Sequence, residues 1–219
     1  KIIEESPSVL LTDETRRAMS EQVVRLCQAV GYESAGTIEF LVDKQQNFYF
    51  LEMNTRLQVE HPVTEQVAAI GENEYVDLVK AMLWIGAGWG FPEEIQQMRD
   101  GHLVHPTHHA MEARIYAEDP LRGFLPSTGP LVPYVEPTIS PHVRVDSGVA
   151  PGHVVTPFYD PMLSKVIASG KTRLEAIQHL KQSMDEYVIE GVQHNARLIQ
   201  GVLRQDAFVT GDTPTSFLP

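Results

Sequence analysis

The spacing of apolar positions changes early in the chain, and the change predicts a helix followed by a β-hairpin. In residues 13–30 apolar side chains recur every three or four positions, with Thr12 placed to cap the helix start and Gly31 to end it. Residues 37–42 and 48–54 are instead rich in β-branched and aromatic side chains, and the polar stretch DKQQN separates them. Two such runs around a short polar turn are typical of an antiparallel hairpin.

A helical pattern returns after Pro62, from about residue 72 to 85, and stops in the glycine-rich run GAGWGFPEE. This run and the histidine-rich GHLVHPTHHA that follows predict a domain boundary, with residues 1–100 before it and 101–219 after it. The histidines raise the alternative of a metal site, but no cysteine accompanies them and their spacing lies in a predicted loop. We interpret the segment as a polar linker; its histidines are His102, His105, His108 and His109.

Short runs with turn signals between them fill the second half of the chain and predict a mostly antiparallel sheet with two closing helices. The predicted strands are roughly residues 110–117, 131–135, 143–146, 154–157 and 163–168. The predicted helices are about 172–186 and 195–204. The pattern therefore predicts an α+β fold.

Composition narrows the class of protein. With 219 residues the chain exceeds one average domain, and none of its apolar runs approaches the roughly 18 to 20 residues of a bilayer span. The net charge of -12 and the lack of a basic stripe argue against nucleic acid as a partner. Cys27 is the only cysteine, so no intrachain disulfide forms and a reducing compartment is expected.

The predicted hairpin places acidic residues opposite each other. If KQQN forms the loop, Asp43 pairs with Phe48, and counting back along both strands puts Glu39 directly across from Glu52. Two carboxylates about 5 Å apart repel unless one is protonated or a cation lies between them. With Asn54 further along the same face, the oxygen ligands suit Mg²⁺ or Mn²⁺ and predict phosphate chemistry. A register slip of one residue would instead turn the two carboxylates to opposite faces.

The residues after this strand are predicted to form a loop that carries Arg56, Gln58 and Glu60. A guanidinium matches a small planar oxyanion such as bicarbonate through two parallel hydrogen bonds, and a nearby carboxylate could act as its base. The alternative is a surface salt bridge between Arg56 and Glu60, which the residues alone favour equally.

Longer motifs carry a family resemblance. The run EMNTRLQVEHPVTE at 52–65, together with GTIEF at 36–40, resembles the biotin carboxylase family of the ATP-grasp fold. The resemblance continues through MEARIYAEDP, FLPSTGPL, VRVDSGV, YDPMLSKV and YVIEGVQHN, so it covers essentially the whole chain. It implies the C-terminal half of an ATP-grasp domain followed by a biotin carboxylase C-terminal α+β domain. The runs VRVDSGVAPG and HLKQSMDEYVIEG are most similar to the alpha subunits of propionyl-CoA carboxylases.

The resemblance assigns roles to individual residues. It implies that metal ions on ATP are held by Glu39, Glu52 and Asn54. Bicarbonate would be bound by Arg56, Gln58, the backbone N–H of Val59, and Lys1. Glu60 would deprotonate bicarbonate for attack on the γ-phosphate, which gives carboxyphosphate. Lys1 would also lie near the ATP phosphate, and the adenine would be surrounded by Leu41, Leu51 and Val192.

Biotin is the implied acceptor of the carboxyl group. By resemblance, Arg144 would stabilise the negative ureido oxygen of biotin after the N1 proton leaves. The residues alone instead favour an ordinary ion pair between Arg144 and Asp146 or Glu136 on an exposed strand.

The resemblance further implies a biotin carboxyl carrier domain, a carboxyltransferase (beta) subunit and a homo-oligomer, located in the mitochondrial matrix or the bacterial cytoplasm. We expect the chain to be a piece of a longer protein and inactive alone. Alternatives are another biotin-dependent carboxylase (methylcrotonyl-CoA, acetyl-CoA or pyruvate), another ATP-grasp ligase, or a non-catalytic dimerisation or docking module.

Overall fold

The computed structural model divides the chain into two compact units, which we describe separately. One unit is Pro7–Thr107, and the other joins Lys1–Ser6 to His108–Pro219. The described residues are 1–70, 74–93, 95–96 and 108–218. The predicted boundary between residues 100 and 101 lies outside them. Among the described helices, none has both the length and the apolar character to cross a membrane.

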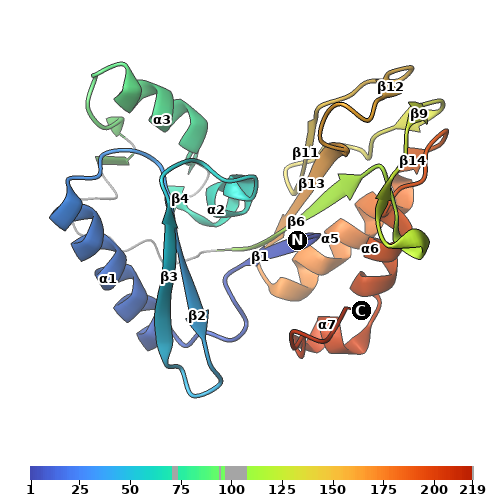
Figure 1. Cartoon of the computed structure of the whole chain (residues 1–219). Helices are drawn as coiled ribbons and strands as arrows, with labels where there is room; N and C mark the ends of the chain where they lie inside the picture. Colours follow the sequence, from blue (N-terminus) through green and yellow to red (C-terminus); the bar gives the residue numbers. More distant parts are fainter. Residues whose placement is uncertain (71–73, 94, 97–107, 219) are drawn as a thin grey trace. The chain divides into compact units, whose positions relative to one another are not determined.

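The unit Pro7–Thr107 begins with helix α1 (Asp13–Val30), as predicted (Figure 1). The side chain of Thr12 accepts a hydrogen bond from the N–H of Thr15 at 3.2 Å, which satisfies a donor of the first turn. Gly31 ends the helix with a φ of 63°, a left-handed conformation that glycine adopts without a steric cost.

The predicted hairpin is present as β2 (Thr37–Val42) and β3 (Phe48–Asn54), but its turn is longer than predicted. Val42, rather than Asp43, pairs with Phe48. The carboxylate of Asp43 instead closes the turn, because it accepts hydrogen bonds from the backbone N–H (2.8 Å) and the side-chain amide (2.9 Å) of Asn47. The predicted pairing of Asp43 with Phe48 is therefore wrong.

A β-bulge corrects the register further along the same hairpin. Phe40 pairs with Phe50, whereas the preceding Glu39 pairs with Glu52, so Leu51 is the extra residue. The bulge compensates for the longer turn. The predicted pairing of Glu39 with Glu52 is confirmed.

Short elements follow the hairpin: α2 (His61–Val67), β4 (Ala69–Ile70), β5 (Glu74–Tyr75) and α3 (Leu78–Gly86). The prediction of a continuous helix from about residue 72 is wrong at β5, and the helix begins only at Leu78. The side chain of Asp77 caps α3 by accepting a hydrogen bond from the N–H of Lys80 at 2.7 Å. Pro62 lies in the first turn of α2, where its missing N–H breaks no helical hydrogen bond.

The other unit is built on a four-stranded antiparallel sheet with the strand order β1-β6-β13-β11 (Figure 1). Its strands are β1 (Ile3–Ser6), β6 (His109–Tyr116), β13 (Met162–Gly170) and β11 (Val143–Ser147). The predicted antiparallel sheet is confirmed. The prediction groups residues 1–6 with the first half of the chain, but hydrogen bonding to β6 places them in this unit.

Three helices belong to this sheet's unit: α5 (Arg173–Glu186), α6 (Ala196–Leu203) and α7 (Asp206–Thr210). Helix α5 packs on β6, β13 and β11, and α6 packs on α5 and β6. Thr172 and Glu175 form a reciprocal capping box at the start of α5. The core between helices and sheet is apolar, and its fully buried members include Met111, Ile115, Ile177, Leu180, Met184 and Ile199.

Two-residue strands pair at the sheet's periphery: β7 (Glu118–Asp119) with β8 (Leu125–Pro126), β9 (Gly129–Pro130) with β12 (Val154–Val155), and β10 (Tyr134–Val135) with β14 (Val188–Ile189). A short 3₁₀ helix, η1 (Pro120–Arg122), lies between β7 and β8. The strands predicted at 131–135 and 154–157 are thus shorter than expected.

Gly191 follows β14 at a very close approach of two backbone segments. A Cβ atom at this position would lie 1.8 Å from the carbonyl oxygen of Pro130, and the residue has a φ of 93°. Gly152 has a similar φ of 81°, but a Cβ atom there would meet nothing within 4 Å. An alanine at Gly152 would meet only the unfavourable backbone conformation, whereas an alanine at Gly191 would also meet a steric clash. Comparing the two substitutions therefore isolates the energetic effect of the clash.

We predict that Gly191→Ala lowers the free energy of unfolding by at least about 3 kcal/mol, whereas Gly152→Ala lowers it by only about 1 kcal/mol. Only the first substitution forces Pro130 to move. Chemical denaturation of both variants checks the difference, and equal losses would contradict it.

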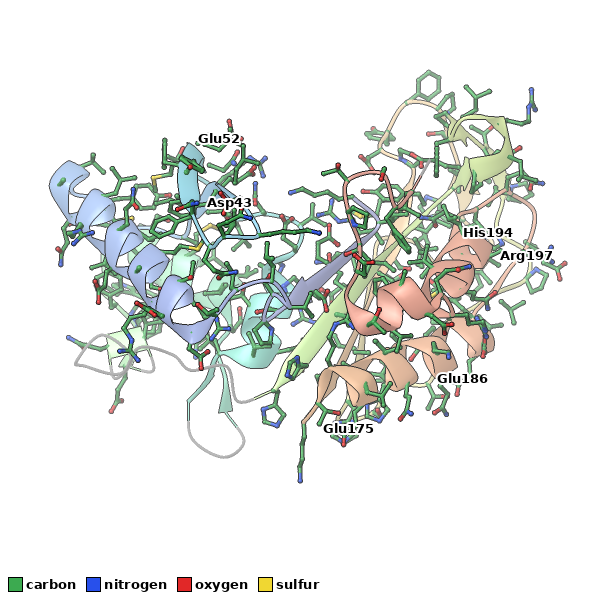
Figure 2. The ribbon with its side chains drawn as sticks, turned by 90° about the horizontal axis from the view of Figure 1, so that it is seen from below. Asp43, Glu52, Glu175, Glu186, His194 and Arg197 are labelled. Atoms are coloured by element: carbon green, nitrogen blue, oxygen red, sulfur yellow. The ribbon has the colours of Figure 1, made fainter. Side chains whose placement is uncertain are left out.

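His194 bridges β14 and the start of α6, near Arg197 (Figure 2). Its Nδ1 accepts a hydrogen bond from the N–H of Ala196 (3.3 Å), so Nε2 carries the proton and donates to the carbonyl of Ile189 (3.1 Å). Burial lowers the pKa of His194; the bond to Ile189 opposes this shift, and the charge of Arg197 adds to it. The net pKa is below the ordinary 6.5, so the fold favours the neutral ring.

We predict that the protein loses stability as the pH falls from 6.5 through the lowered pKa of His194, because the unfolded chain then binds more protons than the folded one. His194→Asn should flatten this dependence. Part of the slope should remain, because burial also lowers the pKa of His109. Thermal unfolding between about pH 7 and pH 5 measures both slopes, and identical slopes would refute the assignment.

Candidate functional site

The acidic end of the hairpin brings together four polar side chains. Glu39 on β2 lies opposite Glu52 on β3, and the amide of Asn54 donates to Oε1 of Glu39 (3.0 Å) and Oε1 of Glu52 (3.2 Å). The amide of Gln58 donates to the same oxygen of Glu39 at 3.3 Å. Figure 2 labels Glu52 on β3, at the end of the hairpin away from Asp43 in the turn. The alternative with the two carboxylates on opposite faces is excluded by this geometry.

This set of donors fits a divalent cation. Two carboxylates that face each other repel. In the structure the neutral amide of Asn54 donates a hydrogen bond to each of them, so only the partial positive charge of its N–H groups lies between the two acids. Carboxylate and amide oxygens are ligands that Mg²⁺ and Mn²⁺ prefer. Glu39, Glu52 and Asn54 could therefore hold such an ion, and they match the predicted metal-binding set.

The loop after β3 is tied to these carboxylates through Gln58. Gln58 is buried, and its Oε1 lies in the protein interior without a hydrogen-bond partner among the described residues. The guanidinium of Arg56 is exposed, and its Nη1 donates to the carbonyl of Leu57 at 3.3 Å. The loop thus carries both an exposed cationic group and a buried amide whose oxygen accepts no hydrogen bond from the described residues.

Glu60 is the residue at which this loop becomes helix α2. The next residue, His61, contacts the buried carboxylate of Glu65 through Nδ1 at 3.0 Å, and Oε1 of Glu65 also accepts from the N–H of Leu78 at 2.9 Å. Glu65 therefore links α2 to the start of α3 and fixes the end of the loop. Sequence reasoning missed this link, although a His and a Glu four positions apart on a helix are the available signal.

The remaining predicted residues fall into different environments. Leu41 and Leu51 lie on the hairpin and are exposed, as residues that contact a ligand can be. Lys1, Arg144 and Val192 belong to the unit that contains the four-stranded sheet. Val192 is buried there in the apolar core. Its role at an adenine stays a prediction, as do the roles of the two leucines and Lys1.

Arg144 forms the ion pair that the residues alone favoured. Its Nε and Nη2 donate to the two carboxylate oxygens of Asp146 at 2.7 and 2.9 Å, and Nζ of Lys165 lies 3.5 Å from Oδ2 of the same residue. Burial raises the pKa of Asp146, but the hydrogen bonds and charges of Arg144 and Lys165 outweigh it, and the pKa is lowered. Asp146 is therefore ionised at neutral pH.

Part of the histidine-rich segment lies within the described residues. His102 and His105 lie outside the described residues, and His109 begins strand β6. Within the described part of the chain, no group of three or more His, Cys, Asp or Glu side chains is placed to hold a metal ion. The hairpin set differs from such a group because an amide is its third member.

Two family models match the chain. Residues 1–94 match the ATP-binding domain of the carbamoyl-phosphate synthase L chain, and residues 112–219 match the biotin carboxylase C-terminal domain. The helices and sheets of both units agree with the predicted α+β architecture, a C-terminal part of an ATP-grasp domain followed by this second domain. That prediction is confirmed.

Curated relatives are similar over the whole chain. The mitochondrial propionyl-CoA carboxylase alpha chains of Sus scrofa and Homo sapiens are both 49% identical over 100% of this chain, which covers 28% of each. Biotin carboxylase 2 of Bacillus subtilis is 45% identical, again over 100% of this chain and 46% of its own length. The chain thus spans less than half the length of these relatives.

Solved structures show the same similarity. The biotin carboxylase domain of a thermophilic 2-oxoglutarate carboxylase bound to bicarbonate has a TM-score of 0.90 and 35% identity, covering 100% of this chain and 46% of that one. A biotin carboxylase complex with β-γ-ATP from Campylobacter jejuni has a TM-score of 0.87 and 35% identity, covering 99% and 45%.

We predict that Glu52→Gln stabilises the metal-free protein by about 0.2–1 kcal/mol, because it removes one of two facing charges. The same substitution should weaken Mn²⁺ binding, measured by electron paramagnetic resonance of the free ion. Asp43→Asn is the matched control in the same hairpin. It should lower stability, since hydrogen bonding to Asn47 is weakened, and leave Mn²⁺ binding intact. Destabilisation of the metal-free Glu52→Gln variant would contradict the repulsion.

Proposed function

The chain belongs to the biotin carboxylase family, and from this premise we propose that it forms part of a biotin carboxylase subunit of an acyl-CoA carboxylase. The reaction would be the carboxylation of biotin with ATP and bicarbonate, catalysed by a ligase that forms a C–N bond. The observation that carries the proposal is the convergence of Glu39, Glu52, Asn54 and Gln58 at the end of the hairpin. It puts a candidate cation site directly beside a loop with an arginine and a second acidic residue.

We assign the metal on ATP to Glu39, Glu52 and Asn54. A bound Mg²⁺ or Mn²⁺ would neutralise negative charge on the transferred phosphoryl group. Arg56 would orient bicarbonate through its planar guanidinium, with Gln58, the N–H of Val59 and Lys1 as further donors.

Glu60 is the proposed base. It would take the proton of bicarbonate while a bicarbonate oxygen forms a bond to the γ-phosphorus and the bond to the ADP oxygen breaks. The products are carboxyphosphate, ADP and a protonated Glu60. Positioning of the two reactants in one site makes the attack effectively unimolecular, which is where the loop's anchoring through Glu65 contributes.

Arg144 is the proposed donor in the second step. Carboxyphosphate would break into CO₂ and phosphate, the phosphate would take the N1 proton of biotin, and N1 would form the new bond to CO₂. Negative charge develops on the ureido oxygen as the proton leaves. A guanidinium at that oxygen stabilises the charge as an oxyanion hole does.

The proposed type of acyl-CoA carboxylase is supported by the names of the relatives and by the motifs of this chain. We propose the propionyl-CoA type, with biotin on a carrier domain, a carboxyltransferase (beta) partner and homo-oligomeric assembly. The mitochondrial matrix is the proposed compartment, and bacterial relatives make a bacterial cytoplasm the alternative. Solved structures of a 2-oxoglutarate carboxylase and a urea carboxylase are also similar, so acceptor assays should include several acyl-CoA substrates.

We predict that Glu60→Gln, in the full-length protein that contains this chain, lowers bicarbonate-dependent ATP cleavage at least about 100-fold. The amide keeps the size of the side chain but cannot accept the proton. Phosphate release with and without bicarbonate and free biotin measures the effect.

The matched control is Glu21→Gln on the exposed surface of α1, which should cleave ATP as the wild type does. Retained turnover in Glu60→Gln would remove Glu60 from its role. Absence of bicarbonate-dependent cleavage in the wild type would overturn the proposed function itself.

A further inference from the structure

Arg144 lies at one end of a row of alternating charges that crosses the four-stranded sheet. We call this row the charge ladder. Its six members, in spatial order, are Glu4, Arg114, Glu112, Lys165, Asp146 and Arg144. They come from all four strands, β1, β6, β13 and β11.

Distances between neighbours define the ladder. Nη2 of Arg114 lies 2.7 Å from Oε1 of Glu4, and its Nε lies 3.8 Å from Oε1 of Glu112. Nζ of Lys165 is 3.7 Å from Oε2 of Glu112 and 3.5 Å from Oδ2 of Asp146. Each interior charge therefore has an opposite charge on both sides.

Strand register explains why these side chains share one face of the sheet. Lys165 is directly opposite both Asp146 on β11 and Arg114 on β6, and directly opposed residues point to the same face. Ile167 on β13 pairs with Arg144 on β11 at one side and with Glu112 on β6 at the other, so an apolar side chain separates these two charged residues. Arg144 contacts Asp146, and Asp146 in turn contacts Lys165.

From Glu112 to Arg144, the exposure of the side chains rises along the ladder. The side chain of Glu112 is fully buried and that of Lys165 is 11% exposed, whereas Asp146 is 28% and Arg144 39% exposed. An exposed ion pair is ordinarily weak, because ordering two flexible side chains offsets the attraction. Here Lys165 already holds the carboxylate of Asp146 in place, so only the arginine remains to be ordered.

The bidentate contact fixes the plane of the guanidinium. Two parallel N–H···O bonds, from Nε and Nη2, leave the group little freedom to rotate. A donor that stabilises developing charge acts best when it is already oriented before the reaction. A lone exposed arginine would have to lose its side-chain freedom at that moment.

We propose that Asp146 is a positioning residue that orients Arg144 for the biotin step, with Lys165 holding Asp146 in turn. The inference rests on the proposed function, because it presupposes that Arg144 meets the ureido oxygen of biotin. It adds that the ion pair serves the second step of the reaction and leaves the first step untouched. The residues assigned to ATP cleavage with bicarbonate are those of the hairpin and its loop together with Lys1 and Val192, and none of them is a member of the ladder.

The test compares two activities of the full-length protein. Asp146→Asn should lower the kcat for carboxylation of free biotin about 10- to 100-fold, less than the roughly 100- to 1,000-fold expected for loss of a donor itself. ATP cleavage with bicarbonate but without biotin should stay within about twofold of the wild type, as should the KM values for ATP and bicarbonate. Asp146→Glu, which moves the carboxylate by one methylene, should give an intermediate loss of the biotin step alone.

Asp185→Asn is the matched control, because Asp185 binds Nη2 of Arg204 through both carboxylate oxygens, at 2.7 and 2.9 Å, between α5 and the end of α6. It should leave both activities unchanged. A parallel fall of both activities in Asp146→Asn would show a merely structural role, and an unchanged biotin step would refute positioning. If Asp146→Asn does not fold, the Asp146→Glu variant is used instead. In that variant too, a parallel fall of both activities would show a structural role, and an unchanged biotin step would refute positioning. A wild type without ATP cleavage would overturn the proposed function, and the inference with it.

Discussion

Repulsion between two facing carboxylates is the constraint around which the hairpin and its loop are organised. Glu39 and Glu52 are held on the same face of the hairpin by backbone pairing, so neither can move away without breaking the ladder of hydrogen bonds. The amides of Asn54 and Gln58 turn toward them, which draws the loop after β3 against the acidic pair. The negative charges of Glu39 and Glu52 attract the proposed cation and also the amide of Gln58 in the loop. The residues proposed to bind bicarbonate therefore lie next to the proposed cation site.

In the four-stranded sheet of the other unit, in contrast to the hairpin, acidic side chains are paired with basic ones. Across its strands each carboxylate alternates with a cation, so the charges compensate one another within the protein. The facing pair Glu39 and Glu52 carries an excess of negative charge, whereas the acidic and basic members of the charge ladder balance one another. An excess of negative charge suits a site that takes up a metal ion, while a compensated row suits a side chain that must keep one orientation.

Structure could be predicted from the sequence where a hydrophobic pattern extends over many residues or where several motifs lie close together. Helices α1 and α5 and strands β6 and β13 were predicted close to their observed bounds, and the facing pair Glu39 and Glu52 followed from counting. Two-residue strands and the short α2 carry too few residues for a periodic signal. Contacts between distant segments, such as β1 with β6 or Asp146 with Lys165, leave no local pattern at all. Val192 shows the same limit, because an apolar residue looks alike whether it lines a core or a nucleotide pocket.

The bulge at Leu51 separates the hairpin into two halves that need not change together. The half near the turn pairs in one register and the acidic half in another, and the extra residue absorbs the mismatch. Omission of Leu51 would join the two registers into one uninterrupted ladder with Glu39 still across from Glu52. During evolution the tip of the hairpin can thus lengthen, shorten or change its turn type, while the metal-binding end keeps its geometry.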